Sequence, residues 1–218
     1  MGSFLDACGG LEGYAGQIKR LHEDPSPYVW PKQFARILTP YFSADTVLVD
    51  VGCSVGYAYK DFRKFDLAYV GLDLEEELLK IARGYFADDP KATFIQYDLM
   101  RGPLPLSGDI VILSDMLGYC SDLITPLTHL ADATKDILLL RALLGETEIR
   151  YTREFLTPEG EPSSLPSNQF AYNDVAHFLY RGGFEVEIIE DEYTGSKPFV
   201  RRDRVRRLYI IFARRKSQ

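Results

Sequence analysis

The sequence predicts an α/β fold, with a doubly wound, mostly parallel sheet and helices on both of its faces. Short apolar, β-branched runs alternate with helix-like segments at least five times along the chain, which is the order of such a sheet. Two of the runs, TVLVDVG at 46–52 and AYVGLDL at 68–74, have the length and composition of buried strands. The 218 residues suit one large domain of this class.

Each predicted element has a local reason. Pro31 fits the first turn of a helix over 31–42, and the acids that begin 75–86 suit the positive end of that helix. Two glycines at 182–183 close a helix over 170–183. The remaining helices are expected at 11–22, 56–65 and 122–134, and the strands at 46–52, 68–74, 92–98, 108–115, 135–145, 184–193 and 204–215.

The composition excludes several classes of protein. Hydrophobic residues make up 46% of the chain and charged residues 26%, which rules out a disordered polar chain. No apolar run approaches the roughly 18 residues of a membrane span, and the first ten residues lack the basic and apolar regions of a secretory signal. The three cysteines are widely spaced, so we expect no metal site, no disulfide framework and a reducing, cytoplasmic location.

Charge is distributed unevenly along the chain. The last 22 residues hold nine Lys or Arg and one acid, whereas the first 196 residues carry a net charge of about -15. The connection that precedes the final strand contains Arg201 and Arg202, and it starts at the rim where we expect a ligand. These arginines suit a carboxylate or phosphate of a substrate. An RNA backbone and simple neutralisation of the acidic body are the alternatives.

Small and acidic residues follow the predicted strands, where a doubly wound sheet binds its ligands. Gly52 and Gly56 permit a tight turn and a close approach of a ligand after the first strand. Asp73 ends the second strand, where an acid can accept hydrogen bonds from both hydroxyls of a ribose. Capping of the helix at 75–86 is the alternative role of Asp73.

The next two strands continue this pattern. Asp98 ends the third strand, although it could also be a turn residue, and Ser114 and Asp115 end the fourth. Acids at successive strand ends disfavour a phosphate ligand. They suit a ligand with a ribose, an adenine and a positive centre.

The segments VLVDVGCSVGY, YVGLDL, ATFIQYDLMRGPLP and GDIVILSDML, in this order, resemble the class I S-adenosylmethionine-dependent methyltransferases over roughly residues 44–145. The resemblance implies a Rossmann-like seven-stranded sheet with a C-terminal antiparallel hairpin, here 184–193 and 204–213. It implies S-adenosylmethionine as cofactor and S-adenosylhomocysteine as product. Ser54 stands where the family usually has the middle glycine of its loop.

The resemblance also assigns roles by position. The first-strand acid and its loop would hold the methionine end of the cofactor, the second-strand acid the ribose, and the third-strand acid the adenine amine. The cofactor-binding candidates are Asp50, Gly52, Cys53, Ser54, Gly56, Asp73, Leu74, Asp98, Leu99, Ser114, Asp115 and Tyr119.

Substrate contacts are expected from three further places. Residues 1–43 are predicted to form a helical cover over a methyltransferase domain at 44–218, and Tyr14, Tyr28 and Trp30 would act as a lid or simply pack. The polar segment 143–169 is expected to be a loop or insertion near the substrate. Arg141 interrupts an apolar strand, so it should face either a ligand cleft or an internal salt bridge.

The leading hypothesis is methyl transfer to a small-molecule acceptor. A more specific version of this hypothesis is that the acceptor is anionic. An RNA methyltransferase and a non-catalytic member of the same fold are the alternatives. A nicotinamide dehydrogenase is disfavoured, because the G-x-G-x-x-G spacing is missing. The candidates for a general base, if the acceptor must lose a proton, are His129, His177, Asp115, Tyr119 and Tyr57.

Overall fold

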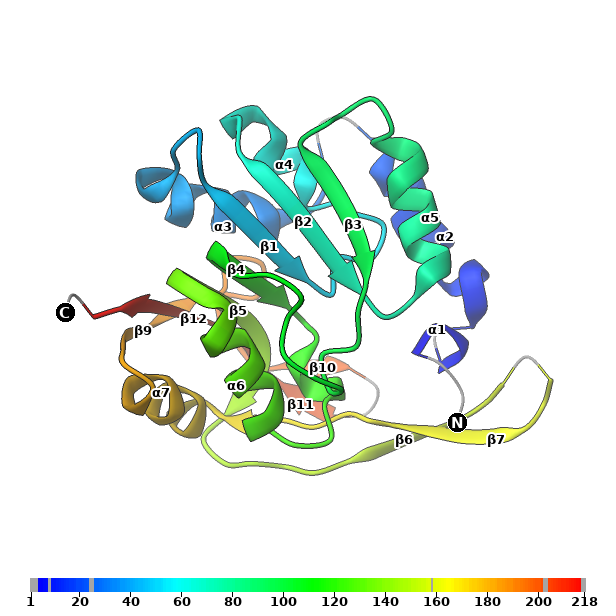
Figure 1. Ribbon diagram of the computed structural model, residues 1–218. Coiled ribbons are helices and arrows are strands. Elements are labelled where there is room, and N and C mark those ends of the chain that lie inside the picture. Colours follow the sequence, from blue (N-terminus) through cyan, green and yellow to red (C-terminus); the bar gives the residue numbers. More distant parts are fainter. Residues whose placement is uncertain (1–3, 8, 24–25, 158, 202–203, 217–218) are drawn as a thin grey trace.

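The computed structural model describes residues 4–7, 9–23, 26–157, 159–201 and 204–216, and its centre is one large sheet (Figure 1). The strand order is β3-β2-β1-β4-β5-β12-β9, and short β8 pairs with the end of β5 beside this path. The first five strands are parallel, whereas β12 runs antiparallel to both of its neighbours, β5 and β9. This arrangement confirms the predicted doubly wound sheet with an antiparallel C-terminal hairpin.

The strands lie close to their predicted positions. The sheet consists of β1 (Val47–Val51), β2 (Ala68–Asp73), β3 (Ala92–Gln96), β4 (Gly108–Ser114), β5 (Thr134–Gly145), β8 (Phe170–Ala171), β9 (Phe184–Glu190) and β12 (Leu208–Arg215). Two separate ribbons are β6 (Thr152–Leu156) with β7 (Pro162–Pro166), and β10 (Phe199–Arg201) with β11 (Arg204–Arg206).

Helices cover both faces of the sheet (Figure 1). One face packs against α2 (Gly10–Leu21), α3 (Val29–Leu38), α4 (Tyr59–Phe62) and α5 (Glu76–Tyr85). The other packs against α6 (Ile124–Ala133) and α7 (Tyr172–Arg181). The short elements are α1 (Phe4–Ala7) and the 3-10 turns η1 (Thr39–Tyr41), η2 (Arg63–Phe65) and η3 (Leu117–Tyr119). None of the helices described here is long and apolar enough to cross a membrane.

The alternation of side chains along each strand divides the core into two layers. In β1, Leu48 packs into the layer under α3 to α5, and its neighbour Val49 packs into the layer under α6 and α7. In β4, Ile112 and Leu113 divide in the same way, and all four side chains are fully buried. A strand buried on both faces needs apolar residues at every position, which explains the continuous apolar runs of the sequence.

The N-terminal helices share a core with the sheet. Tyr14 and Leu21 of α2, and Trp30 and Phe34 of α3, belong to the same buried cluster as Leu48 of β1. The helical cover therefore packs as an integral layer of the molecule. The boundary at residue 43 stays a prediction.

The segment at 143–169 is more ordered than a loop. Residues 143–145 still belong to β5, and β6 and β7 form an antiparallel ribbon that extends past α1 (Figure 1). Buried Asn168 anchors its base: its backbone N–H donates to the carbonyl of Gly118 at 2.7 Å and its side-chain amide to that of Cys120 at 2.9 Å. The ribbon has a polar, Pro-containing sequence with largely exposed residues, so periodicity gave no strand signal there.

Candidate active site

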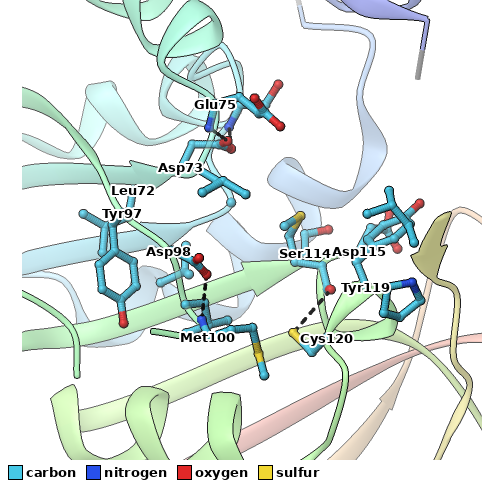
Figure 2. A pocket seen from close by; sticks show the side chains of 18 of the residues that line it. Leu72, Asp73, Glu75, Tyr97, Asp98, Met100, Ser114, Asp115, Tyr119 and Cys120 are labelled. Carbon is cyan, nitrogen blue, oxygen red and sulfur yellow. Dashed lines mark hydrogen bonds between the residues drawn. The ribbon is translucent and has the colours of Figure 1, made fainter. Parts of the chain in front are cut away.

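A cavity of about 870 Å³ opens at the carboxyl ends of β1 to β4 (Figure 2). This volume lies within the roughly 300–1,000 Å³ of typical ligand pockets. Besides the strand ends, α2 and the β6–β7 ribbon contribute to its wall. The lining residues are Gly13, Tyr14, Gln17, Val51, Gly52, Ser54, Tyr57, Leu72, Asp73, Leu74, Glu75, Tyr97, Asp98, Leu99, Met100, Arg101, Ser114, Asp115, Met116, Tyr119, Cys120, Arg153, Ser164, Leu165 and Pro166.

Most of the predicted site residues line this one cavity. Those in the wall are Tyr14, Gly52, Ser54, Asp73, Leu74, Asp98, Leu99, Ser114, Asp115 and Tyr119. Those outside the wall are Asp50, Cys53, Gly56, Tyr28, Trp30 and Arg141. Arg202 lies outside the described residues, and only the backbone of Arg201, at the end of β10, is described. Their predicted contact with the acceptor stays a prediction.

Asp73 connects the loop after β1 to the start of α5. Its carboxylate accepts the backbone N–H of Ser54 at 2.8 Å and that of Glu75 at 3.0 Å. Glu75 is the N-cap of α5, so Asp73 supports the helix start without being the cap itself. Burial raises the pKa of Asp73, and the two backbone donors oppose this shift. Asp73 is 8% exposed and faces the cavity, where its remaining lone pairs can accept ligand hydroxyls.

Asp50, in contrast, turns away from the cavity. Its side chain is 2% exposed and accepts the hydroxyl hydrogen of Tyr69 at 2.6 Å. Burial raises the pKa of Asp50 to about 7, the Tyr69 bond opposes the shift, and the charge of Asp73 adds to it. Asp50 therefore supports the loop from beneath and does not contact the space that a ligand would fill.

The stability of Asp50→Asn relative to wild type should be higher at pH 8 than at pH 5. Between the ordinary pKa of 3.8 and the folded value of about 7, the folded wild type holds a proton that the unfolded chain has lost. Wild-type stability from this group therefore falls as pH rises through that window. Asparagine does not titrate, so the variant lacks this loss. Thermal unfolding of both proteins from pH 5 to 8 measures the difference, and a gap that stays constant would contradict a shifted Asp50.

The two glycines of the loop have different surroundings. Gly52 has a φ of +79°, and a Cβ there would lie 2.3 Å from Cγ of Met116, a residue of the cavity wall. Gly56 has a φ of +75°, and a Cβ there would lie 2.8 Å from Cε1 of buried Phe94. Gly56 is thus required for packing beneath the loop. Ser54, which replaces the family's middle glycine, adopts a φ of 54° and still donates its N–H to Asp73.

Gly52→Ala should destabilise the protein by about 1–2 kcal/mol, the cost of a left-handed conformation for a residue with a Cβ. The displaced Met116 side chain should also weaken binding of S-adenosylhomocysteine severalfold. The matched control is Gly84→Ala in α5, where a Cβ meets nothing within 4 Å and should stabilise by about 0.5–1 kcal/mol. Equal melting temperatures of the two variants would contradict the expected strain at Gly52.

The wall at the ends of β2 and β3 combines apolar and acidic side chains. Leu74 and Leu99 both line it, and Leu74 is 43% exposed. Asp98 accepts the backbone N–H of Met100 at 2.9 Å and pairs with Nε of Arg101 at 3.1 Å. Two leucines and an acceptor form a suitable surface for a flat, amine-bearing ring.

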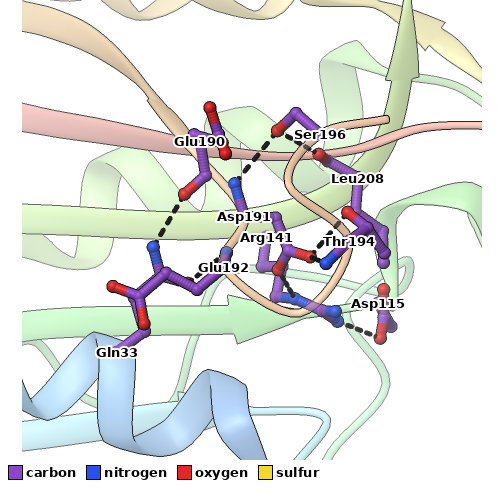
Figure 3. A network of polar contacts seen from close by, with 9 residues as sticks. All are labelled: Gln33, Asp115, Arg141, Glu190, Asp191, Glu192, Thr194, Ser196 and Leu208. Carbon is purple, nitrogen blue, oxygen red and sulfur yellow. Dashed lines mark hydrogen bonds and ion pairs between the residues drawn. The ribbon is translucent and has the colours of Figure 1, made fainter. Parts of the chain in front are cut away.

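Arg141 lies in an internal salt bridge, which resolves the two alternatives for this residue (Figure 3). Its Nε donates to Asp191 at 2.6 Å, and its Nη1 pairs with Asp115. Arg141 and Asp191 are 3% and 0% exposed, whereas Asp115 is 45% exposed and faces the cavity. Asp191 also accepts the N–H and hydroxyl of Thr194. The network therefore connects the loop after β9 to the cavity wall.

The aromatic residues near the N-terminus form a layer behind the wall. Tyr57 lines the cavity, Tyr28 stacks on it at a centroid distance of 4.3 Å, and Trp30 meets its edge at 5.9 Å. Tyr14 is the predicted lid residue that reaches the cavity. Burial raises the pKa of Tyr57, which favours its neutral form.

The histidines proposed as bases lie elsewhere. His129 contacts the carbonyl oxygen of Leu99 through Nδ1 at 2.8 Å, and His177 is exposed on α7. Neither lines the cavity, whereas Asp115, Tyr119 and Tyr57 do. Within the described parts of the chain, no group of three His, Cys, Asp or Glu residues could hold a metal ion.

Sequence reasoning missed several wall residues. Glu75 and Met116 both line the cavity. Each directly follows a predicted strand, so the rule that ligands bind at strand ends could have found them. Gln17 of α2 and Arg153 of the ribbon come from segments whose packing the sequence does not reveal.

Residues 48–136 match a family model described as a methyltransferase domain. This segment begins in β1, ends in β5 and includes the strand-end residues of the cavity from Val51 to Tyr119. No curated protein sequence matches the chain.

Solved structures share the fold at low sequence identity. Magnesium protoporphyrin IX methyltransferase from Synechocystis PCC 6803, with bound S-adenosylhomocysteine, has a TM-score of 0.65 and 16% identity, over 98% of this chain and 97% of that chain. A TehB-like S-adenosylmethionine-dependent methyltransferase from Corynebacterium glutamicum has a TM-score of 0.63 and 17% identity, over 94% and 97%. A glycopeptide N-methyltransferase complexed with S-adenosylmethionine has a TM-score of 0.61 and 13% identity, over 85% and 87%.

The sheet order and the strand-end cavity define a protein with the fold of the class I methyltransferases. Residues 48–136 match a methyltransferase domain, and S-adenosylmethionine-dependent methyltransferases are among the solved structures that share the fold of the chain.

Proposed function

We propose that the protein transfers a methyl group from S-adenosylmethionine to a small-molecule acceptor and releases S-adenosylhomocysteine. The observation that carries this proposal is a single cavity of about 870 Å³. Its floor contains the strand-end acids and the glycine loop, and its sides come from α2 and the β6–β7 ribbon. A cavity enclosed in this way suits an acceptor small enough to fit beside the cofactor.

The wall offers suitable groups for each part of the cofactor. Asp73 would accept the ribose hydroxyls, while Leu74, Leu99 and Asp98 would surround the adenine. The loop around Gly52 would hold the methionine end. Ser114 supports this assignment, because its Oγ is buried in the wall without a hydrogen-bond partner. A buried hydroxyl in this condition favours a bound polar ligand.

When bound, S-adenosylmethionine supplies a methyl group already activated by its sulfonium. The chain therefore needs chiefly to align the acceptor and exclude water. Tyr14 of α2 and Leu165 of the ribbon would close the cavity from two sides. Asp115 and Tyr119 follow β4 and are the wall residues best placed to receive a proton, if the acceptor must lose one. Arg141 would hold Asp115 in position.

Proteins of similar structure methylate different acceptors. One of them acts on magnesium protoporphyrin IX and another on a glycopeptide, although both share this fold. The shape of the acceptor must therefore come from this chain's own wall, chiefly from the β6–β7 ribbon and η3.

Isothermal titration with S-adenosylhomocysteine tests the first half of the proposal. We expect saturable binding with one molecule per chain, and no binding at millimolar ligand would overturn the proposal. Incubation with methyl-labelled cofactor and separate pools of small metabolites and RNA tests the second half. Label in the small-molecule pool is expected, and label in RNA alone would replace the small acceptor by RNA.

A further inference from the structure

The guanidinium of Arg153 places a positive charge in the cavity wall. It lies on β6, opposite Leu165 of β7, and both side chains line the cavity wall. Its Nη2 donates to the carbonyl oxygen of Ala7 in α1 at 2.6 Å. Its Nη1 is buried and has no hydrogen-bond partner. One half of the guanidinium is thus fixed to the protein, and the other half is an unused donor.

A buried guanidinium donor without a partner is unfavourable. Leaving a buried polar group unpaired loses the hydrogen bonds that the group makes in water, and the loss is larger when the group is charged. Native proteins therefore satisfy such groups with protein, water or ligand. The fixed fork of arginine suits the paired oxygens of a carboxylate or a phosphate.

The acids of the wall do not satisfy Arg153. Asp98 pairs with Arg101, and Asp115 pairs with Arg141. Asp73 accepts two backbone N–H groups, and Glu75 accepts the N–H of Leu5 at 2.9 Å. Among the described cavity residues, no carboxylate forms an ion pair with Arg153. The other wall cation, Arg101, is 87% exposed and is therefore largely solvated.

The ribbon holds Arg153 in a defined place. Buried Asn168 bonds the base of the ribbon to η3 through the carbonyls of Gly118 and Cys120. Its Oδ1 accepts the N–H of Tyr151, just before β6, at 3.0 Å. The ribbon also packs on η3 and α1. A cation fixed before binding loses little conformational entropy when a ligand arrives.

We infer that Arg153 binds an anionic oxygen group, a carboxylate or phosphate, of a molecule held in this cavity. The inference rests on the proposed function and refines it. The anion has two sources: the carboxylate of the cofactor's methionine moiety, or an acidic group of the acceptor. Either source places a negative group at the ribbon side of the cavity.

The test compares wild type with Arg153→Gln, using Arg150→Gln as the matched control. Arg150 is an arginine just before the same ribbon, but it is 48% exposed and lies outside the cavity wall. The first arm titrates S-adenosylhomocysteine and 5′-methylthioadenosine, which lacks the amino-acid part. The second arm measures thermal stabilisation by benzoate, succinate and inorganic phosphate, with and without saturating S-adenosylhomocysteine. Arg153→Lys keeps the charge, and it replaces Arg153→Gln if that variant does not fold.

Two results support the inference, and each identifies a source. If the cofactor supplies the carboxylate, Arg153→Gln should weaken S-adenosylhomocysteine binding roughly ten- to a hundredfold and leave 5′-methylthioadenosine unchanged. If the acceptor supplies the anion, both nucleosides should bind as in wild type, and Arg153→Gln should abolish stabilisation by the added anions. Arg150→Gln should behave as wild type in both arms, because Arg150 does not line the cavity.

Unchanged behaviour of Arg153→Gln in both arms would overturn the inference. The proposed function fails separately, when wild-type protein does not bind S-adenosylhomocysteine. In that event the anion series without nucleoside still tests Arg153.

Discussion

Asp73→Ala should weaken binding of S-adenosylhomocysteine by about 1.5–3 kcal/mol, which is roughly ten- to a hundredfold. In the proposed function, the variant loses the acceptor assigned to the ribose hydroxyls. It also leaves the N–H groups of Ser54 and Glu75 without their partner, so the loop after β1 is no longer connected to α5. Isothermal titration measures the affinity, and thermal unfolding measures the structural part of the effect.

Asp89→Ala is the matched control for Asp73. Asp89 accepts the N–H of Lys91 at 3.1 Å, so it resembles Asp73 in receiving a backbone N–H two residues further on. It lies outside the cavity wall. This control should lower the melting temperature and leave ligand affinity unchanged. If Asp73→Ala gave that same result, Asp73 would serve only the structure of the loop.

Arg141→Met should destabilise the protein by about 3–5 kcal/mol. The substitution keeps the length and apolar stem of the side chain but removes the cation that pairs with Asp191, which is fully buried. An uncompensated charge in that position is far more costly than the loss of one contact. Chemical denaturation of wild type and variant gives the free energy of unfolding directly.

Two further variants test whether the burial of the Arg141–Asp191 pair causes the loss of stability. Arg214→Met breaks the ion pair between Arg214 and Asp136, whose side chains are 48% and 43% exposed. Because this pair is at the surface, the variant should lower the free energy of unfolding by at most about 1 kcal/mol. Combining Arg141→Met with Asp191→Asn removes the buried charge and should recover much of the lost stability. If Arg141→Met cost no more than Arg214→Met, the buried pair would be much better solvated than the structure indicates.

The sequence alone determined the fold class and the strand ends. Strands buried on both faces have continuous apolar runs, and helices repeat their apolar residues every three to four positions, so both signals are local. The parallel order then brings Asp73, Asp98 and Ser114 to one edge of the sheet. For this reason ten of the predicted site residues line the cavity.

Tertiary structure decided which strand-end residues reach the ligand space. Asp50 and Asp73 follow similar apolar runs, yet Asp50 lies on the same face of β1 as Leu48 and bonds to Tyr69 beneath the loop. Gly56 is a glycine because Phe94 packs against it. Sequence spacing identifies the loop after β1. Contacts with side chains of β2 and β3 determine which residues of β1 and its loop face the cavity.

Tertiary structure also decided the surroundings of Arg141 and Arg153. Arg141 pairs with Asp191, fifty residues further along the chain, because the antiparallel insertion of β12 brings the loop after β9 over the end of β5. Arg153 reaches the cavity because Asn168 anchors the base of its ribbon to η3. Charge pairs between distant segments leave no periodic trace in a sequence, since only the packed sheet sets the distance between them.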